Sequence, residues 1–122
     1  TILGTAFKPN TDDIRDSIAI ELIKKLLKKK AEIIIHDPKA MKNTKKQFEE
    51  KINYAKTIND ALSKSQCVII MTQWKQYEKL TKKQFKYMKT KFVIDCRRML
   101  VKKQLDVDYY AIGLGKINWN TL

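Results

Sequence analysis

The stretch that decides the fold is Cys67-Val68-Ile69-Ile70-Met71-Thr72, residues 67–72, the most apolar segment of the chain. A short continuous apolar run is typical of a parallel strand that is buried on both faces of its sheet. The run is far too short to cross a bilayer, so a membrane partner is not expected. We therefore expect residues 67–72 to form a central strand.

Working outward, shorter apolar runs alternate with amphipathic segments. We expect further strands over 2–7, 32–35, 52–55, 92–94 and 109–112, and helices over 17–30, 40–48, 57–62, 76–80 and 81–88. Ser17 has the residue type of a helix N-cap. Strands separated by helices imply right-handed crossovers and a mostly parallel sheet with helices on both faces. The predicted fold is one α/β domain over residues 1–122, a Rossmann-like three-layer sandwich.

The charge balance bears on the class of partner. The chain has 26 basic and 13 acidic residues, and a net charge of +13 first suggests a nucleic-acid partner. However, the only arginines are Arg15, Arg97 and Arg98, and the lysines are spread along nearly every predicted helix. Because Arg is the side chain favoured for phosphates and base edges, we expect a solvated, lysine-rich surface rather than a nucleic-acid interface.

Cysteine and histidine usage argues against a metal site. Cys67 and Cys96 form no CxxC pair, and His36 is the single histidine. We expect reduced thiols in a cytoplasmic protein. A nucleophilic role is not expected for Cys96, which has no neighbouring His, and His36 is expected to be a satisfied polar residue rather than a catalytic one.

In open α/β sheets, ligands bind beyond the carboxyl ends of the strands. The segments that follow the predicted strands are 7–15, 36–38, 72–74 and 95–98. They contain all three arginines and Trp74, so Lys8 and Arg97 are expected to converge there on an anionic or hydroxyl-rich ligand. The phosphate-binding pattern GxGxxG is missing, and the domain is therefore not expected to bind a dinucleotide on its own.

Four segments carry a resemblance to a known family. Residues 4–17 read GTAFKPNTDDIRDS, and three shorter motifs follow in order, His36-Asp37-Pro38-Lys39, Thr72-Gln73-Trp74 and Asp95-Cys96-Arg97. Together they resemble the C-terminal, UDP-binding domain of the UDP-glucose/GDP-mannose dehydrogenase family, over nearly the whole chain. The opening residues Thr1 to Gly4 look like the inside of a strand, so we expect the chain to be part of a longer protein.

The resemblance implies an NAD-dependent oxidoreductase that converts the C6 alcohol of a UDP-sugar to a carboxylate. In this family an N-terminal domain holds NAD, a central helical region forms dimers, and the nucleophilic Cys and main acid/base residues lie upstream. No catalytic residue is therefore expected within residues 1–122, and the chain alone should show no turnover. A homo-oligomer is expected for the full enzyme.

Residue roles follow from the same resemblance. Phe7, Lys8 and Arg97 are implied as substrate contacts, and Arg15 is implied as the residue that reaches NAD. The Trp and Asp-x-Arg elements favour the UDP-glucose branch, although glucose, an N-acetylhexosamine and a mannose derivative all stay open. Cys96 departs from the family's usual Gly, which puts the geometry of Arg97 in question.

Each of these roles has a structural alternative. The alternative for Lys8 is an ordinary surface lysine, and the alternative for Phe7 is a core residue at the end of a strand. The alternative for Arg15 is an ion pair with Asp12, Asp13 or Asp16. For Trp74, packing is preferred over a stacking platform. Two other function classes also stay open, a basic nucleic-acid-binding module and a stand-alone interaction domain.

Overall fold

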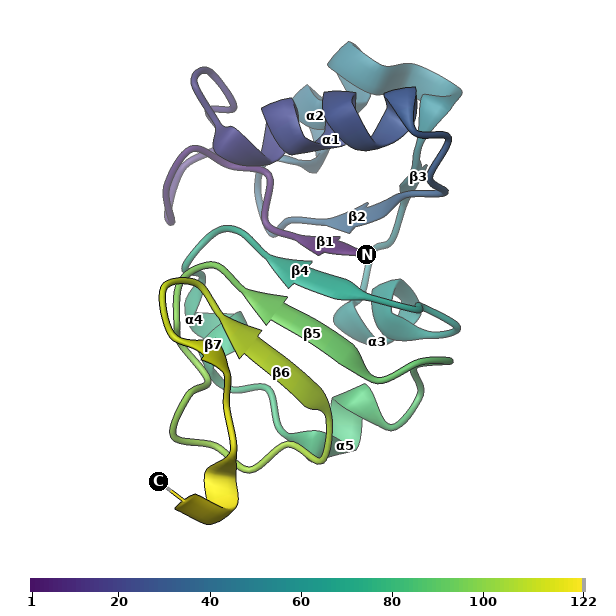
Figure 1. The fold of residues 1–122 in the computed structure, drawn as a ribbon. Coiled ribbons are helices and arrows are strands. Elements are labelled where there is room, and N and C mark those ends of the chain that lie inside the picture. The colour runs from purple at the N-terminus through teal and green to yellow at the C-terminus, as the bar shows by residue number, and fades with distance from the viewer. Residues whose placement is uncertain (122) are drawn as a thin grey trace.

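A computed structural model describes residues 1–121 and places seven strands in one sheet, in the order β3-β2-β1-β4-β5-β6-β7 (Figure 1). The strands are β1 (Ile2–Leu3), β2 (Ile34–His36), β3 (Asn53–Tyr54), β4 (Val68–Ile70), β5 (Phe92–Asp95), β6 (Asp108–Ala111) and β7 (Gly115–Lys116). All neighbours pair in parallel except β6 and β7, which are antiparallel. The predicted central strand is β4, at the middle of the order.

Helices connect the parallel strands. They are α1 (Ile18–Lys28), α2 (Met41–Phe48), α3 (Ile58–Leu62), α4 (Lys75–Glu78) and α5 (Lys82–Phe85), with 3-10 turns at Glu49–Lys51 and Trp119–Thr121. Within residues 1–121, no helix is long and apolar enough to span a membrane.

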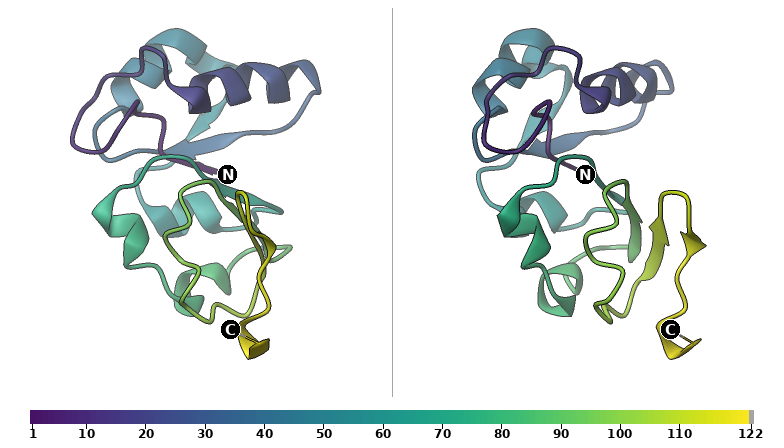
Figure 2. Two further views of the ribbon diagram at one scale, coloured as in Figure 1. Left: turned by 60° about the vertical axis from the view of Figure 1, so that its left-hand side comes forward. Right: turned by 90° about the vertical axis from the view of Figure 1, so that its left-hand side faces the viewer.

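The sheet separates two hydrophobic cores. On one face, α1 and α2 cover the β1–β3 half, where Ile23 and Phe48 pack with Ile35. On the other face, α3, α4 and α5 pack against β4–β6 through Leu62, Tyr77 and Phe85 (Figures 1 and 2). The predicted three-layer α/β sandwich is confirmed.

Two strand predictions were wrong in extent. The first strand ends at Leu3 instead of residue 7, because Gly4 turns the chain with a φ of +96°. The strand predicted over 109–112 is not the last, because β7 returns alongside β6 after a turn that contains Gly113 at φ +79°. Both differences lie where a glycine adopts a backbone conformation that other residues rarely take.

Ser17 begins α1 as predicted, but it does not cap the helix. Its side chain makes no capping hydrogen bond and instead donates to the backbone oxygen of Thr5 at 2.8 Å. The start of α1 is thereby tied to the segment that leaves β1.

Candidate functional site

The carboxyl ends of β1, β4 and β5 meet beside the first turn of α1, where they form a hollow of about 280 Å³. We call it the Phe7–Arg97 hollow. Its lining residues are Ala6, Phe7, Asp16, Ser17, Ile18, Ala19, Met71 and Arg97. The structure thus brings together two of the residues that the sequence singled out, from segments distant in the chain.

The side chain of Arg97 is held by the loop after β4. Its Nε donates to the backbone oxygen of Met71 at 2.7 Å, and its backbone N–H donates to Asp95 Oδ1 at 2.9 Å. Arg97 itself is exposed. Nε therefore orients the guanidinium, and the terminal nitrogens make no hydrogen bond within residues 1–121.

Cys96 does not disturb this turn. Its backbone is outside the left-handed region, and the positive φ in this segment, +56°, belongs to Arg98. The Cys96 N–H also donates to Ile70 O at 3.0 Å, which continues the sheet ladder. A side chain in place of the family's usual glycine is therefore accommodated without backbone strain.

Asp95 organises the loop that carries Arg97. It is fully buried and accepts hydrogen bonds from the N–H groups of Arg97 and Leu100 and, at 2.6 Å, from the hydroxyl of Tyr109. Burial, together with this hydrogen bond to Asp95, raises the pKa of Tyr109. The Asp of the Asp-Cys-Arg motif is therefore a structural residue.

Gly4 allows the β1 and β4 loops to lie against each other. A Cβ at this position would lie 2.4 Å from Thr72 Cβ, far inside contact distance. Thr72 in turn donates its hydroxyl to Ala6 O at 2.9 Å. This close approach fixes the backbone immediately before Phe7.

Asp37 is a second buried carboxylate that sequence reasoning did not single out. Its side chain accepts from the backbone N–H groups of Thr5, Ala6, Lys39 and Ala40 and from Trp74 Nε1, at distances of 2.7–3.1 Å. The available signal was an Asp-Pro pair directly after a predicted strand. Trp74 is buried in the core, so the expected packing role is the one the structure shows.

Lys8 lies on the exposed loop between β1 and α1 and is not among the residues that line the hollow. The convergence of Lys8 and Arg97 on one mouth stays a prediction. Strand order places both residues at the carboxyl edge, and the neighbouring Phe7 is 48% exposed.

Arg15 forms the predicted alternative ion pair, with Asp13. Its Nε and one terminal nitrogen donate to the Asp13 carboxylate at 2.8–3.2 Å, and its backbone N–H donates at 2.9 Å. These hydrogen bonds lower the pKa of Asp13 to about 2. The Arg15 side chain remains 87% exposed, so the pair orients the guanidinium without burying it.

The cysteines and His36 show no catalytic arrangement. Burial raises the pKa of both Cys67 and Cys96, and both thiols are free. His36 is buried and contacts Tyr77, and its pKa is lowered by burial. Over residues 1–121, no three His, Cys, Asp or Glu side chains group closely enough to hold a metal ion.

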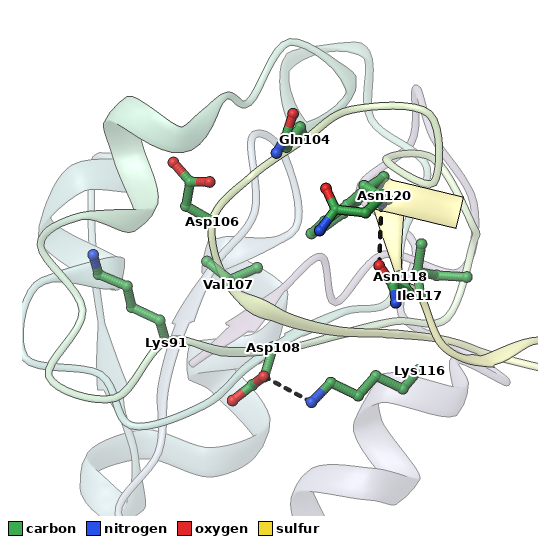
Figure 3. A pocket seen from close by; sticks show the side chains of 10 residues that line it. Lys91, Gln104, Asp106, Val107, Asp108, Lys116, Ile117, Asn118 and Asn120 are labelled. Atoms are coloured by element: carbon green, nitrogen blue, oxygen red, sulfur yellow. Dashed lines mark hydrogen bonds and ion pairs between the residues drawn. The ribbon is translucent and has the colours of Figure 1, made fainter. Parts of the chain in front are cut away.

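A larger polar hollow, of about 700 Å³, lies at the opposite, amino edge of the sheet (Figure 3). Within it, Lys116 pairs with Asp108 at 3.0 Å, and the backbone N–H of Asn120 donates to Asn118 Oδ1 at 3.1 Å. The Phe7–Arg97 hollow is the stronger candidate for ligand binding, because it lies at the carboxyl ends of the parallel strands, where ligands of open α/β sheets bind.

Comparison with known proteins bears on the family to which the chain belongs. A family model described as the UDP-glucose/GDP-mannose dehydrogenase family, UDP binding domain, matches residues 1–102. UDP-glucose 6-dehydrogenase AglM of Haloferax volcanii is 38% identical over 111 residues, which cover 91% of this chain and 25% of that protein. UDP-glucose 6-dehydrogenase of Rickettsia bellii is 33% identical over 117 residues, 92% of this chain and 27% of that protein.

Solved structures also resemble this chain. A UDP-glucose dehydrogenase from Pyrobaculum islandicum superposes with a TM-score of 0.68 and 37% identity over 77% of this chain and 20% of that chain. A UDP-D-ManNAc dehydrogenase from Pyrococcus horikoshii, with a TM-score of 0.76 and 21% identity over 93% of this chain and 25% of that chain, shares the fold. The chain spans about a quarter of the length of the curated relatives it matches.

Proposed function

Since the chain belongs to the UDP-glucose/GDP-mannose dehydrogenase family, as its UDP-binding domain, we propose that the Phe7–Arg97 hollow receives the diphosphate of a UDP-sugar. The proposed reaction of the whole enzyme is oxidation of the C6 alcohol of UDP-glucose, or of a related UDP-sugar, to the carboxylate of the UDP-uronate. The nucleophilic cysteine and the acid/base residues are then supplied by parts of the enzyme other than residues 1–122.

The observation that carries this proposal is the anchored guanidinium of Arg97 beside Phe7. Nε is committed to Met71 O, so the two terminal nitrogens are available to an anionic group in a fixed direction. Two parallel N–H···O hydrogen bonds suit phosphate oxygens better than a single lysine point charge does. Asp16 also lines the hollow, so the diphosphate is expected on its Arg97 side.

Phe7 and Lys8 complete the proposed substrate contacts. Phe7 presents a half-exposed ring at the mouth of the hollow, where a ligand would cover it. Lys8 is exposed on the adjoining loop, and it makes no ion pair within 4.0 Å among residues 1–121. An exposed ammonium at this place can approach a bound anion from the open side.

For the cofactor, we propose that Arg15 holds an anionic group of NAD. The Asp13 carboxylate engages Nε and one terminal nitrogen, which leaves the other terminal nitrogen and most of the side chain exposed. This arrangement fits a contact to a phosphate presented by another domain. NAD, when bound, supplies the hydride acceptor for the oxidation, and Arg15 contributes orientation.

In this proposal the domain contributes to catalysis by positioning. Fixing the uridine diphosphate places the sugar C6 against groups held elsewhere in the enzyme, which converts binding free energy into alignment of the reacting atoms. We further propose a cytoplasmic homo-oligomer, a setting in which the free thiols of Cys67 and Cys96 stay reduced.

Calorimetric titration of the chain with UDP, UDP-glucose and a DNA duplex tests the proposal. We expect weak, saturable binding of both UDP ligands, and Arg97→Lys should weaken it by about tenfold because the bidentate contact is lost. The matched control is Arg98→Lys, which changes the neighbouring arginine and should have no effect. Binding of DNA alone, with affinity that falls steeply with salt, would favour the nucleic-acid alternative.

A further inference from the structure

A second hollow lies at the carboxyl ends of β2 and β3, on the α3–α5 face of the sheet. It has a volume of about 400 Å³, and it shares no residue with the Phe7–Arg97 hollow. Its polar lining comes from His36, Lys56, Thr57, Asn59, Gln76, Lys79 and Gln84. We call it the His36 hollow, and its chemistry is set by one imidazole and two lysines.

The tautomer of His36 follows from its contacts with Tyr77. The tyrosine oxygen lies 2.8 Å from His36 Nδ1 and 2.9 Å from the backbone oxygen of His36. A tyrosine hydroxyl has a single proton, and the carbonyl oxygen can only accept. Both contacts are hydrogen bonds only if Tyr77 donates to the carbonyl and Nδ1–H donates to Tyr77. The remaining nitrogen, Nε2, is then an unprotonated acceptor.

Among residues 1–121, Nε2 of His36 has no hydrogen-bond partner. His36 is only 4% exposed. In that same part of the chain, every fully buried side-chain nitrogen and oxygen has a partner. Nε2 must therefore be accessible, and the His36 hollow is the space that the His36 side chain adjoins.

Two cations accompany this acceptor. Lys56 follows β3 and Lys79 follows α4, and both are exposed. Neither forms an ion pair with a carboxylate within 4.0 Å in the described chain. The hollow therefore offers positive charge to an anion and a neutral nitrogen that requires a hydrogen-bond donor.

We propose that the His36 hollow binds inorganic phosphate in its hydrogen phosphate form. The anionic oxygens face Lys56 and Lys79, and the remaining P–OH group donates to His36 Nε2. Sulfate has the same shape and charge but no proton to donate, so its oxygen would meet the lone pair of Nε2. Sulfate would cover this accessible acceptor without offering it a donor, and the penalty for an acceptor buried in that way makes the site selective.

The selectivity depends on His36 staying neutral. Burial lowers the pKa of His36, and the adjacent Asp37 opposes that effect only in part. Lys56 and Lys79 line the same hollow, and Tyr77 is a neutral partner. Above the ordinary His pKa of 6.5, Nε2 thus remains an acceptor, whereas at lower pH a protonated ring would accept sulfate as well.

Amide and imidazole NMR titrations of the chain at about pH 8, well above the usual His pKa, provide the test. We expect the Nδ1–H tautomer of His36 in the free protein and saturable phosphate shifts at Thr57, Gln76 and Lys79. Sulfate should bind at least about tenfold more weakly, in keeping with the cost of an unsatisfied acceptor. A proton on Nε2 in the free protein, or equal affinity for both anions, would overturn the proposal.

Variants separate a built site from general attraction to a basic protein. His36→Asn keeps a polar group near Tyr77 and removes Nε2, so it should abolish the preference for phosphate over sulfate. Lys56→Gln/Lys79→Gln should weaken phosphate binding by about tenfold or more. The control Lys28→Gln/Lys29→Gln removes the same charge from the end of α1 and should leave the phosphate affinity unchanged. An equal loss of phosphate affinity in both double variants would contradict a specific site.

Discussion

Gly4 sets the path of the chain out of β1. Its φ of +96° is a conformation that side chains disfavour, and a Cβ would lie 2.4–2.7 Å from Thr72 atoms, including that residue's backbone nitrogen. The space is closed because the loops after β1 and β4 are hydrogen-bonded to each other there. Only glycine at position 4 therefore allows the backbone before Phe7 to follow this path.

Gly4→Ala is accordingly predicted to lower the free energy of unfolding by about 3 kcal/mol, from the combined cost of backbone strain and the clash with Thr72. Gly113→Ala is the matched control, since Gly113 also has a positive φ but a methyl group there would have no other atom within 4 Å. The control should cost about 1 kcal/mol. Urea unfolding of both variants measures the difference in the free energy of unfolding. Equal losses in the two variants would show that contact with Thr72 does not exclude a side chain at position 4.

The Asp13–Arg15 pair makes a prediction about pH. Hydrogen bonds from Arg15 lower the Asp13 pKa from 3.8 to about 2. Because the folded-state pKa is the lower one, the pair's contribution to stability is complete above pH 3.8 and is lost as the pH falls through about 2. In carboxyl NMR titrations, Arg15→Gln should return the Asp13 pKa to about 3.8, whereas Lys24→Gln should leave it unchanged. An Asp13 pKa near 3.8 in the unmodified protein would contradict the hydrogen bonds from Arg15 to the Asp13 carboxylate.

At the scale of elements, Asp37 joins three segments. Its carboxylate accepts from the segment after β1 (Thr5, Ala6), from the start of α2 (Lys39, Ala40) and from Trp74 after β4. All five donors are N–H groups. The side-chain NH2 group of an asparagine at position 37 would face at least one of them, so two donors would point at each other. The carboxyl edge is therefore held by an acceptor-only side chain.

Asp37→Asn should lower the free energy of unfolding by about 3 kcal/mol, because it leaves buried donors unsatisfied. Asp60→Asn, at an exposed position on α3, should change it by less than about 0.5 kcal/mol. Chemical denaturation with tryptophan fluorescence reports both, since Trp74 is one of the donors. A loss no larger than that of the control would show that Asp37 is not the link between these segments.

The elements were largely predictable because apolar runs and helical periodicity reflect burial. What the sequence patterns did not contain was the extent of β1 and the existence of β7, since both depend on glycine conformations and on pairing with other strands. The meeting of Phe7 and Arg97 followed from parallel strand order. The organising roles of Asp37 and Asp95 depend on loop paths and partners that no local pattern specifies.

At the scale of the whole molecule, basic residues outnumber acidic ones by 26 to 13, a net charge of +13, and ion pairs leave this excess unchanged. Those within residues 1–121 are surface pairs such as Lys24–Glu21 and Lys116–Asp108, which contribute little individually. Self-repulsion among the lysines should therefore destabilise the fold at low ionic strength.

Raising NaCl from about 10 mM to about 150 mM is predicted to increase the melting temperature by a few degrees, because salt screens this repulsion. Calorimetry of the unmodified chain measures the effect. A melting temperature that falls with salt would mean that attractive pairs, rather than repulsion among lysines, dominate the electrostatic free energy.

The proposed role of the whole domain depends on where UDP binds. The most direct measurement is the change in the amide NMR spectrum as UDP is added. The largest shifts are predicted at Phe7, Met71 and Arg97, together with a shift of the Arg97 Nε–H, and none at residues 104–108 and 116–120. Saturable shifts confined to the amino edge, with Phe7 and Arg97 unchanged, would contradict the proposed site.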